Sequence, residues 1–217
     1  MAILELLLWL LKVMVAILPY FIGEVSNLIC LMKPAPEPLR LEELHGTGQI
    51  AFIPSGDFPL EQVETYAKFY RDTYEIPITI FPRLPLPYSA FDPYREQYIA
   101  EKILAAVPQL PPNSSSETPW IPIVFTNQDI YIQAYDWRYA FSLRKNVSAV
   151  VSSARMDFSL NPFRPADPET QEVRLRKMVT KNIGVLYFHL PTNDHCQSAM
   201  YGRVGGPQEL DLMSDYL

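Results

Sequence analysis

The sequence predicts an α/β domain preceded by an N-terminal hydrophobic helix. Strand-like and helix-like segments alternate through the last three quarters of the chain, which is typical of α/β domains. The first residues are almost entirely apolar, and a stretch with three prolines follows them. We therefore predict three parts: a hydrophobic membrane anchor at 1–32, a proline-rich linker at 33–48 and a globular domain at 49–217.

The composition excludes several classes of function. The 217 residues include 18 Lys and Arg against 24 Asp and Glu, which gives a net charge of −6. The chain therefore lacks the basic surface of a nucleic-acid-binding protein, and we expect no nucleic-acid partner. Hydrophobic residues make up 48%, so the chain is not disordered. Two cysteines are too few for a disulfide framework or a four-cysteine metal site.

The N-terminal segment favours a membrane location. Residues 2–18 carry only two charged side chains, Glu5 and Lys12, and as a helix they would extend about 26 Å, close to the roughly 30 Å of a hydrocarbon core. We predict a membrane-spanning anchor. The alternatives are a helix lying in the membrane interface and a buried helix of a soluble assembly. No positive charge precedes the apolar run, so a cleaved secretory signal is not expected.

The two charges in this segment predict a partner. Glu5 and Lys12 are seven residues apart, so a helix would place them on one face. A charge deep in a bilayer costs about 2.5–3.5 kcal/mol, so we expect this face to contact a protein partner or a larger membrane complex. Lys33 and Arg40 follow the segment and nothing basic precedes it, which favours the globular domain on the cytoplasmic side.

The globular part shows alternating elements. Short apolar or β-branched runs predict strands, and apolar residues at helical spacing predict helices. Asp92 and Pro93 have the residue types of a helix cap and first helical position, and Pro168 begins a second long helix. The predicted strands are 49–53, 76–81, 120–126, 129–132 and 147–156; the predicted helices are 60–74, 92–107, 168–186 and 209–216.

Three stretches resemble the archaemetzincin family of zinc peptidases, and the resemblance extends over 49–217. They are Phe125-Thr-Asn-Gln-Asp-Ile-Tyr-Ile; Trp137-Arg-Tyr-Ala-Phe with Ala149-Val-Val-Ser-Ser-Ala-Arg; and 174–184, which leads to Ser198-Ala-Met200-Tyr. The resemblance implies a metzincin-like mixed sheet with long helices. It also implies a substrate held as an extended strand along a sheet edge.

The chemistry of that family is missing from the matching helix. The family motif H-E-x-x-H-x-x-G-x-x-H supplies three zinc ligands and a general base. Lys181 and Val185 stand at the first two His positions, Asn182 at the Glu position and Pro191 at the third His position, while Phe188 replaces the glycine. An ammonium group, an amide and an alkyl chain cannot take these roles. We therefore expect no metal and no other cofactor.

Nearby residues offer weaker alternatives. His189, His195 and Cys196 lie within eight residues and are the candidates for a displaced metal site. Met200 keeps the position of the Met-turn, although an ordinary core methionine explains it equally simply. A basic run predicts a solvated helix face, with contact to anionic headgroups or an acidic partner as the alternative; it consists of Arg174, Arg176, Lys177 and Lys181.

From these observations the sequence favours a non-catalytic function. The predicted protein is a membrane-associated metzincin-like pseudoenzyme that binds a protein or peptide, or that serves as a structural subunit of a membrane complex. The alternative is a zinc-dependent metallopeptidase with unconventional ligands. The metal content of the purified protein distinguishes the two.

Overall fold

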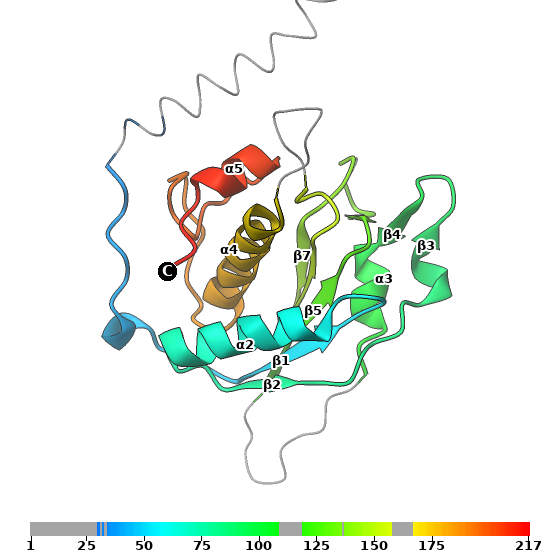
Figure 1. Ribbon diagram of the computed structural model, residues 1–217, viewed down its shortest axis with the longest axis horizontal. Helices are drawn as coiled ribbons and strands as arrows, with labels where there is room; N and C mark the ends of the chain where they lie inside the picture. Colours follow the sequence, from blue (N-terminus) through cyan, green and yellow to red (C-terminus); the bar gives the residue numbers. More distant parts are fainter. Residues whose placement is uncertain (1–29, 31, 33, 109–118, 136, 158–166) are drawn as a thin grey trace, which may run out of the picture.

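The computed structural model describes residues 30, 32, 34–108, 119–135, 137–157 and 167–217. Its centre is a five-stranded sheet in the order β2-β1-β5-β8-β7 (Figure 1). Four strands are parallel, and β7 pairs antiparallel with β8 at one edge, so the sheet is mixed. The strands are β1 (Gln49–Pro54), β2 (Ile78–Ile80), β5 (Trp120–Thr126), β7 (Ser142–Lys145) and β8 (Ser148–Ser152).

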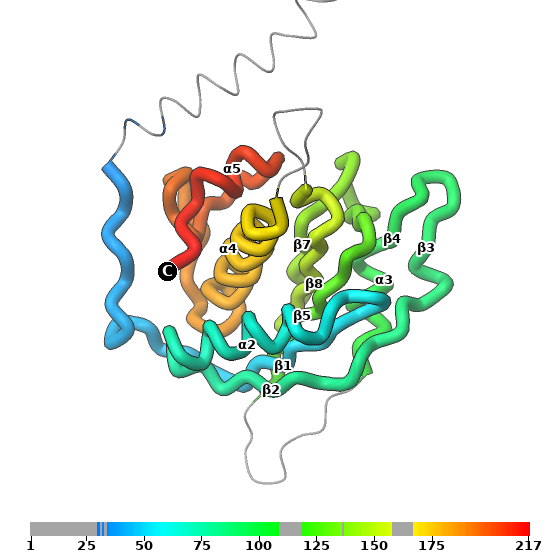
Figure 2. The backbone as a smooth tube through the Cα atoms, in the orientation of Figure 1, coloured from blue at the N-terminus to red at the C-terminus, as the bar shows by residue number. Residues whose placement is uncertain are grey.

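Helices cover both faces of this sheet. Side chains alternate along β1, so Ile50 and Phe52 pack with α2 (Leu60–Tyr74) and α4 (Pro168–Leu186), whereas Ala51 and Ile53 pack with α3 (Ala100–Ala105). The short helix α5 (Pro207–Leu212) lies beside α4 (Figure 2). The predicted mixed α/β fold is confirmed. Two 3-10 helices, η1 (Leu41–Glu43) and η2 (Tyr88–Ala90), lie in the connections.

The long helix α4 begins where the sequence predicts. Asp167 caps it, because its carboxylate accepts a hydrogen bond from the Thr170 amide at 2.8 Å, and Pro168 occupies the first helical turn. Leu175, Val179 and Ile183 recur at helical spacing and are fully or almost fully buried. This packing fixes which side of α4 turns toward the sheet.

The prediction that a helix begins at Asp92 is wrong, because a strand and a turn lie there. Asp92 ends β3 (Phe91–Asp92), and its carboxylate accepts hydrogen bonds from two following amides in a turn that leads to β4 (Gln97–Ile99). Glu96 closes that turn with a left-handed φ of 53°. The same residues that cap a helix also initiate such turns, and helix α3 begins only at Ala100. With β6 (Ile130–Tyr131), the hairpin forms a separate three-stranded sheet.

The predicted membrane location also needs correction. In the described part of the chain, no helix is long and apolar enough to cross a membrane. The N-terminal hydrophobic helix is not shown, because the predicted anchor, with Glu5 and Lys12, lies outside the described residues except for Cys30 and Met32. The localisation on a membrane, with the domain on its cytoplasmic side, therefore has no support. The boundaries at residues 32 and 48 stay predictions.

Candidate active site

A cleft of about 750 Å³ lies between the edge strand β7 and helix α4. Among the described strands, β7 has a neighbour on one side only, so its outer edge faces the cleft region. The segment before β7 and the loop at 202–205 complete the walls. Charged and aromatic side chains line much of it: Tyr135, Trp137, Arg138, Tyr139, Arg144, Lys181 and Arg203.

Lys181 enters the cleft from α4. Its side chain is only 4% exposed, and its ammonium group donates one long hydrogen bond, 3.4 Å, to the carbonyl of Gly202. Burial, which disfavours the charged form, and to a smaller extent the nearby guanidinium of Arg144 together lower the pKa of Lys181 to about 8. The lysine is thus buried with little compensation.

Arg144 enters the same cleft from β7. Its guanidinium donates a hydrogen bond of 3.3 Å to the side-chain carbonyl of Asn182. Asn182 is fully buried, and its amide nitrogen donates to the Met178 carbonyl at 2.7 Å, which keeps its oxygen toward Arg144. Burial lowers the pKa of Arg144 as well, although an arginine stays charged at neutral pH.

Among the residues that the structure describes, no acidic side chain compensates these two cations. The lining of the cleft contains neither Asp nor Glu. Within the described ranges, neither Lys181 nor Arg144 forms an ion pair with a carboxylate, whereas other basic residues do. The cleft therefore presents positive charge that no carboxylate in the described part of the chain neutralises.

The rest of the basic run behaves differently, and the prediction of a solvated helix face is wrong for it. Arg174 forms a two-pronged ion pair with Asp211 at 2.7 Å for both bonds, and Arg176 pairs with Asp215 at 2.5 Å. Lys177 donates to the carbonyls of Leu210 and Asp211. Arg174, Arg176 and Lys177 therefore bind groups of the C-terminal segment. Because these bonds use their charged groups, the predicted alternative, contact with anionic headgroups, does not apply to these three residues.

Three of the residues matched to the family motif lie on α4 (Pro168–Leu186), and their match to that motif stays a prediction. Lys181 and Asn182 are buried and Val185 is half-buried. The chain turns after the helix at His189, whose φ is +55°, one residue beyond Phe188. Pro191 as the third ligand position stays a prediction; counted from the turn at His189, that position falls on Thr192.

Met200 lies beneath α4. A side chain at Gly184 would meet the Met200 sulfur at 2.5 Å, so the glycine permits close contact between the helix and this residue. The Ser198 hydroxyl accepts a hydrogen bond from the Met200 amide at 3.0 Å and holds the turn. The location agrees with a Met-turn and with an ordinary core methionine alike.

The candidates for a displaced metal site are not brought together. His189 hydrogen-bonds to Thr47 at 2.6 Å, and His195 to the carbonyl of Pro34 at 2.8 Å. Cys196 forms a disulfide with Cys30. Among the described residues there is no group of three side chains of the types that hold a metal. Within the described ranges, neither the motif positions nor these three residues together supply the donor set that a zinc ion needs.

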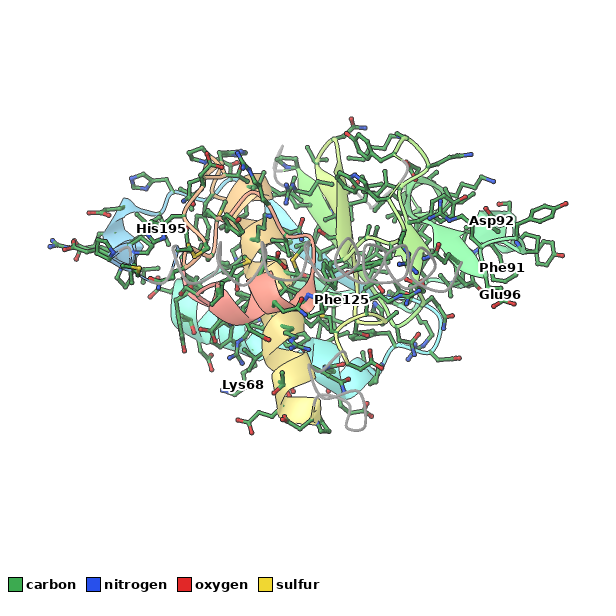
Figure 3. The ribbon with its side chains drawn as sticks, turned by 90° about the horizontal axis from the view of Figure 1, so that it is seen from above. Lys68, Phe91, Asp92, Glu96, Phe125 and His195 are labelled. Atoms are coloured by element: carbon green, nitrogen blue, oxygen red, sulfur yellow. A yellow bond between two sulfur atoms is a disulfide. The ribbon has the colours of Figure 1, made fainter. Side chains whose placement is uncertain are left out.

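Asp92 and Glu96 belong to the turn between β3 and β4, where Arg95 donates hydrogen bonds to the carbonyls of the cleft residues Trp137 and Arg138 at 2.7 and 3.1 Å. Figure 3 shows Asp92 and Glu96 at one end of the molecule and His195 toward the other. The Asp92 carboxylate accepts a hydrogen bond from Tyr131 at 2.8 Å, which lowers its pKa. The Asp92 carboxylate and the left-handed Glu96 are thus structural parts of the β3–β4 turn.

Neither β7 nor the location of Arg144 in the cleft was predicted from the sequence. A signal was present: Lys145 pairs with Ser148, so Asn146 and Val147 form a two-residue hairpin loop. Asn146 has a φ of +54°, and asparagine is a preferred residue for this position of such a turn. The polar segment Ser142–Lys145 does not have the alternating apolar pattern by which a strand is usually recognised.

Comparisons with known proteins show which proteins share the fold of this chain. No family model matches the chain. The archaemetzincin of Haloquadratum walsbyi is 23% identical over 152 residues, which cover 69% of this chain and 82% of that protein. A zinc-dependent peptidase from Methanocorpusculum labreanum has a similar structure, with a TM-score of 0.63, 23% identity, and coverage of 77% and 95% of the two chains. The archaemetzincin of Archaeoglobus fulgidus, solved in complex with malonate, is also similar, with a TM-score of 0.61 and 18% identity. The match covers 77% of this chain and 94% of that chain.

The fold is therefore similar to that of the solved archaemetzincins. The chain is an archaemetzincin-like protein whose helix α4 lacks the zinc-binding motif of that family. The same comparisons contradict the predicted non-catalytic, membrane-associated pseudoenzyme, because the similar proteins are named archaemetzincins or a zinc-dependent peptidase. The metallopeptidase alternative agrees with them better.

Proposed function

We propose that this chain is a peptidase that acts on extended peptides held between β7 and α4. The observation that carries the proposal is the cleft along the free edge of β7. The names of the similar proteins support the peptidase class. A protein partner in the form of a peptide substrate also agrees with the composition, which disfavours nucleic acid.

The geometry of β7 supports binding by strand addition. In an antiparallel pair, the backbone groups of successive residues point alternately toward and away from the neighbouring strand. The Ser152 amide donates to the Phe141 carbonyl at 2.8 Å, and Lys145 pairs with Ser148 across the two-residue turn. This register directs the amides of Ser142 and Arg144 away from β8, where a peptide strand would accept their hydrogen bonds.

The proposal assigns no step to a metal. The family chemistry requires three ligands and a carboxylate base, and the described residues at those positions do not supply them. The disulfide removes Cys196 from the set of free thiols. We propose hydrolysis in this cleft only because the cleft lies along the edge of β7. In hydrolysis, water adds to the peptide carbonyl and the released amine takes up a proton.

The test is direct cleavage of peptides by the purified full-length chain. A pool of unstructured peptides is incubated with the protein alone, with chelator and with added Zn²⁺, and new termini are identified by mass spectrometry. We expect cleavage that is lost in Ser142→Pro, because proline removes an outward amide while edge strands tolerate it. An unchanged melting temperature of that variant shows that the sheet is intact. No cleavage in any arm would overturn the proposal.

A further inference from the structure

The charge of the cleft is opposite to that of the whole chain. The protein carries a net charge of −6, yet the charged residues of the lining are all basic: Arg138, Arg144, Lys181 and Arg203. Arg203 makes an exposed ion pair with Asp194 at 3.5 Å. The two cations deeper in the cleft have no such partner within the described structure.

Burial makes the missing partner significant. An ion taken out of water loses hydration, and a nearby opposite charge is the usual compensation. Lys181 is 4% exposed and donates to the Gly202 carbonyl at 3.4 Å, and Arg144 donates to the amide oxygen of Asn182 at 3.3 Å; within the described residues neither has a carboxylate partner. Two like charges also repel each other across the cleft, so both would gain from an anion placed between them.

We propose that the cleft recognises its peptide substrate by a carboxylate group that Lys181 and Arg144 bind together. This inference rests on the proposed peptidase function and specifies the substrate class: peptides with an acidic side chain, or with a free C-terminal carboxylate, at the position beside these residues. A guanidinium binds a carboxylate with two parallel hydrogen bonds, and an ammonium adds a compact charge. Arg144 lies on the strand that would pair with the peptide, so one strand provides both backbone and side-chain contacts.

Binding of four related peptides to the full-length chain tests the proposal. They share one extended sequence that contains either Glu or Gln at a central position, each with a free or an amidated C-terminus. At pH 7 we expect the peptide with the recognised carboxylate to bind at least about tenfold more tightly than its neutral counterpart, as a hydrogen-bonded charge pair predicts. The Glu/Gln comparison reports a side-chain carboxylate, and the free/amidated comparison reports the terminus.

Three variants locate the effect. Lys181→Met and Arg144→Gln should each reduce the preference for the carboxylate peptide to less than threefold. Lys68→Met is the matched control, because Lys68 is an exposed lysine on the outer side of α2 that pairs with Asp72 at 2.5 Å (Figure 3). This control should keep the full preference.

The outcomes separate this inference from the peptidase proposal. Equal affinity for all four peptides, or a preference that survives both cleft variants, would overturn carboxylate recognition even if the peptides are cleaved. A carboxylate preference that disappears in Lys181→Met and Arg144→Gln supports it, even if no peptide is cleaved and the peptidase proposal fails. Absence of binding to any of the four would overturn it as well.

Discussion

Helix α4 carries buried cations in two regions, and their surroundings differ. In the first region, Arg174 and Lys177 meet acidic side chains or carbonyls of the C-terminal segment. In the second region, Lys181 lies one turn further along and faces Arg144 across a cleft whose described lining contains no acidic residue. Buried positive charge on α4 therefore has two different roles, one structural and one in ligand binding. Where the chain provides the anion, the cation joins elements of the fold; where it does not, the cation is available to a ligand.

The largest effect is expected from Arg174→Ala. Arg174 is buried, donates to the carbonyl of the buried Met156 at 2.7 Å and forms two bonds to the half-exposed Asp211, so its removal leaves a buried carbonyl without its donor and separates α4 from the C-terminal segment. The free energy of unfolding should fall by about 3 kcal/mol. Urea denaturation measures it, with the exposed Lys68→Ala as control. A loss below about 0.5 kcal/mol, the size of a surface substitution, would contradict the structural role of this region.

The same substitution at two lysines should have opposite effects. Lys177→Met removes hydrogen bonds to two carbonyls, and we expect a loss of about 2 kcal/mol. Lys181→Met replaces an uncompensated buried cation by an apolar chain of similar length, and we expect a gain of about 1 kcal/mol. Parallel denaturation curves at pH 7 measure both. Equal losses would mean that the two regions do not differ.

The pH dependence sharpens the comparison. Because the pKa of Lys181 is lowered to about 8 in the folded chain, the unfolded chain keeps a proton that the folded chain releases between about pH 8 and pH 10. The free energy of unfolding should therefore rise with pH in this window, by at most about 1.4 kcal/mol per unit. Burial raises the pKa of Tyr66 and Tyr70, so their opposite effect begins only near pH 10 and above.

The rise should disappear in Lys181→Met. Denaturation of both proteins at several pH values provides the difference, in which other groups cancel. The titratable and charged groups that face Lys181 or line its cleft are Arg144, Arg138, Arg203, Tyr135 and Tyr139. A flat difference between pH 8 and pH 10 would show that an anion already neutralises the lysine.

The smallest effect is expected at the rim of the cleft. Arg203 pairs with Asp194 at 3.5 Å, and both side chains are about four-fifths exposed, at 79% and 81%. Exposed pairs contribute little because water and salt screen them. Arg203→Ala should change the free energy of unfolding by less than about 0.5 kcal/mol. A larger loss would show that the rim, too, belongs to the structural region.

Much of the fold could be predicted from local signals. The apolar stripe and the Asp167 cap fix α4, and apolar runs locate β1 and β5. Asp92 misled the prediction because its carboxylate can cap a helix or a turn with equal chemistry, and the sheet contact of Phe91 decides between them.

The candidate site could be predicted only in part. Lys181 and Asn182 were recognised by their positions in a motif. Arg144 was not, because it is 37 residues away in sequence and meets them only after β7 pairs with β8. The basic run could not be interpreted from the sequence either. Its sequence does not show that Asp211 and Asp215 form ion pairs with Arg174 and Arg176, whereas no described carboxylate pairs with Lys181.

The most direct test of the account is the pKa of Lys181 itself, measured by NMR on protein with isotope-labelled lysine, with Lys181→Met for assignment. We expect a pKa of about 8 for Lys181 in the free protein. When a carboxylate peptide is bound, its negative charge should raise the pKa of Lys181. A neutral peptide of the same sequence should not raise it. A pKa near 10.5 in the free protein, or no change with the carboxylate peptide, would contradict the claim that this cleft awaits an anionic ligand.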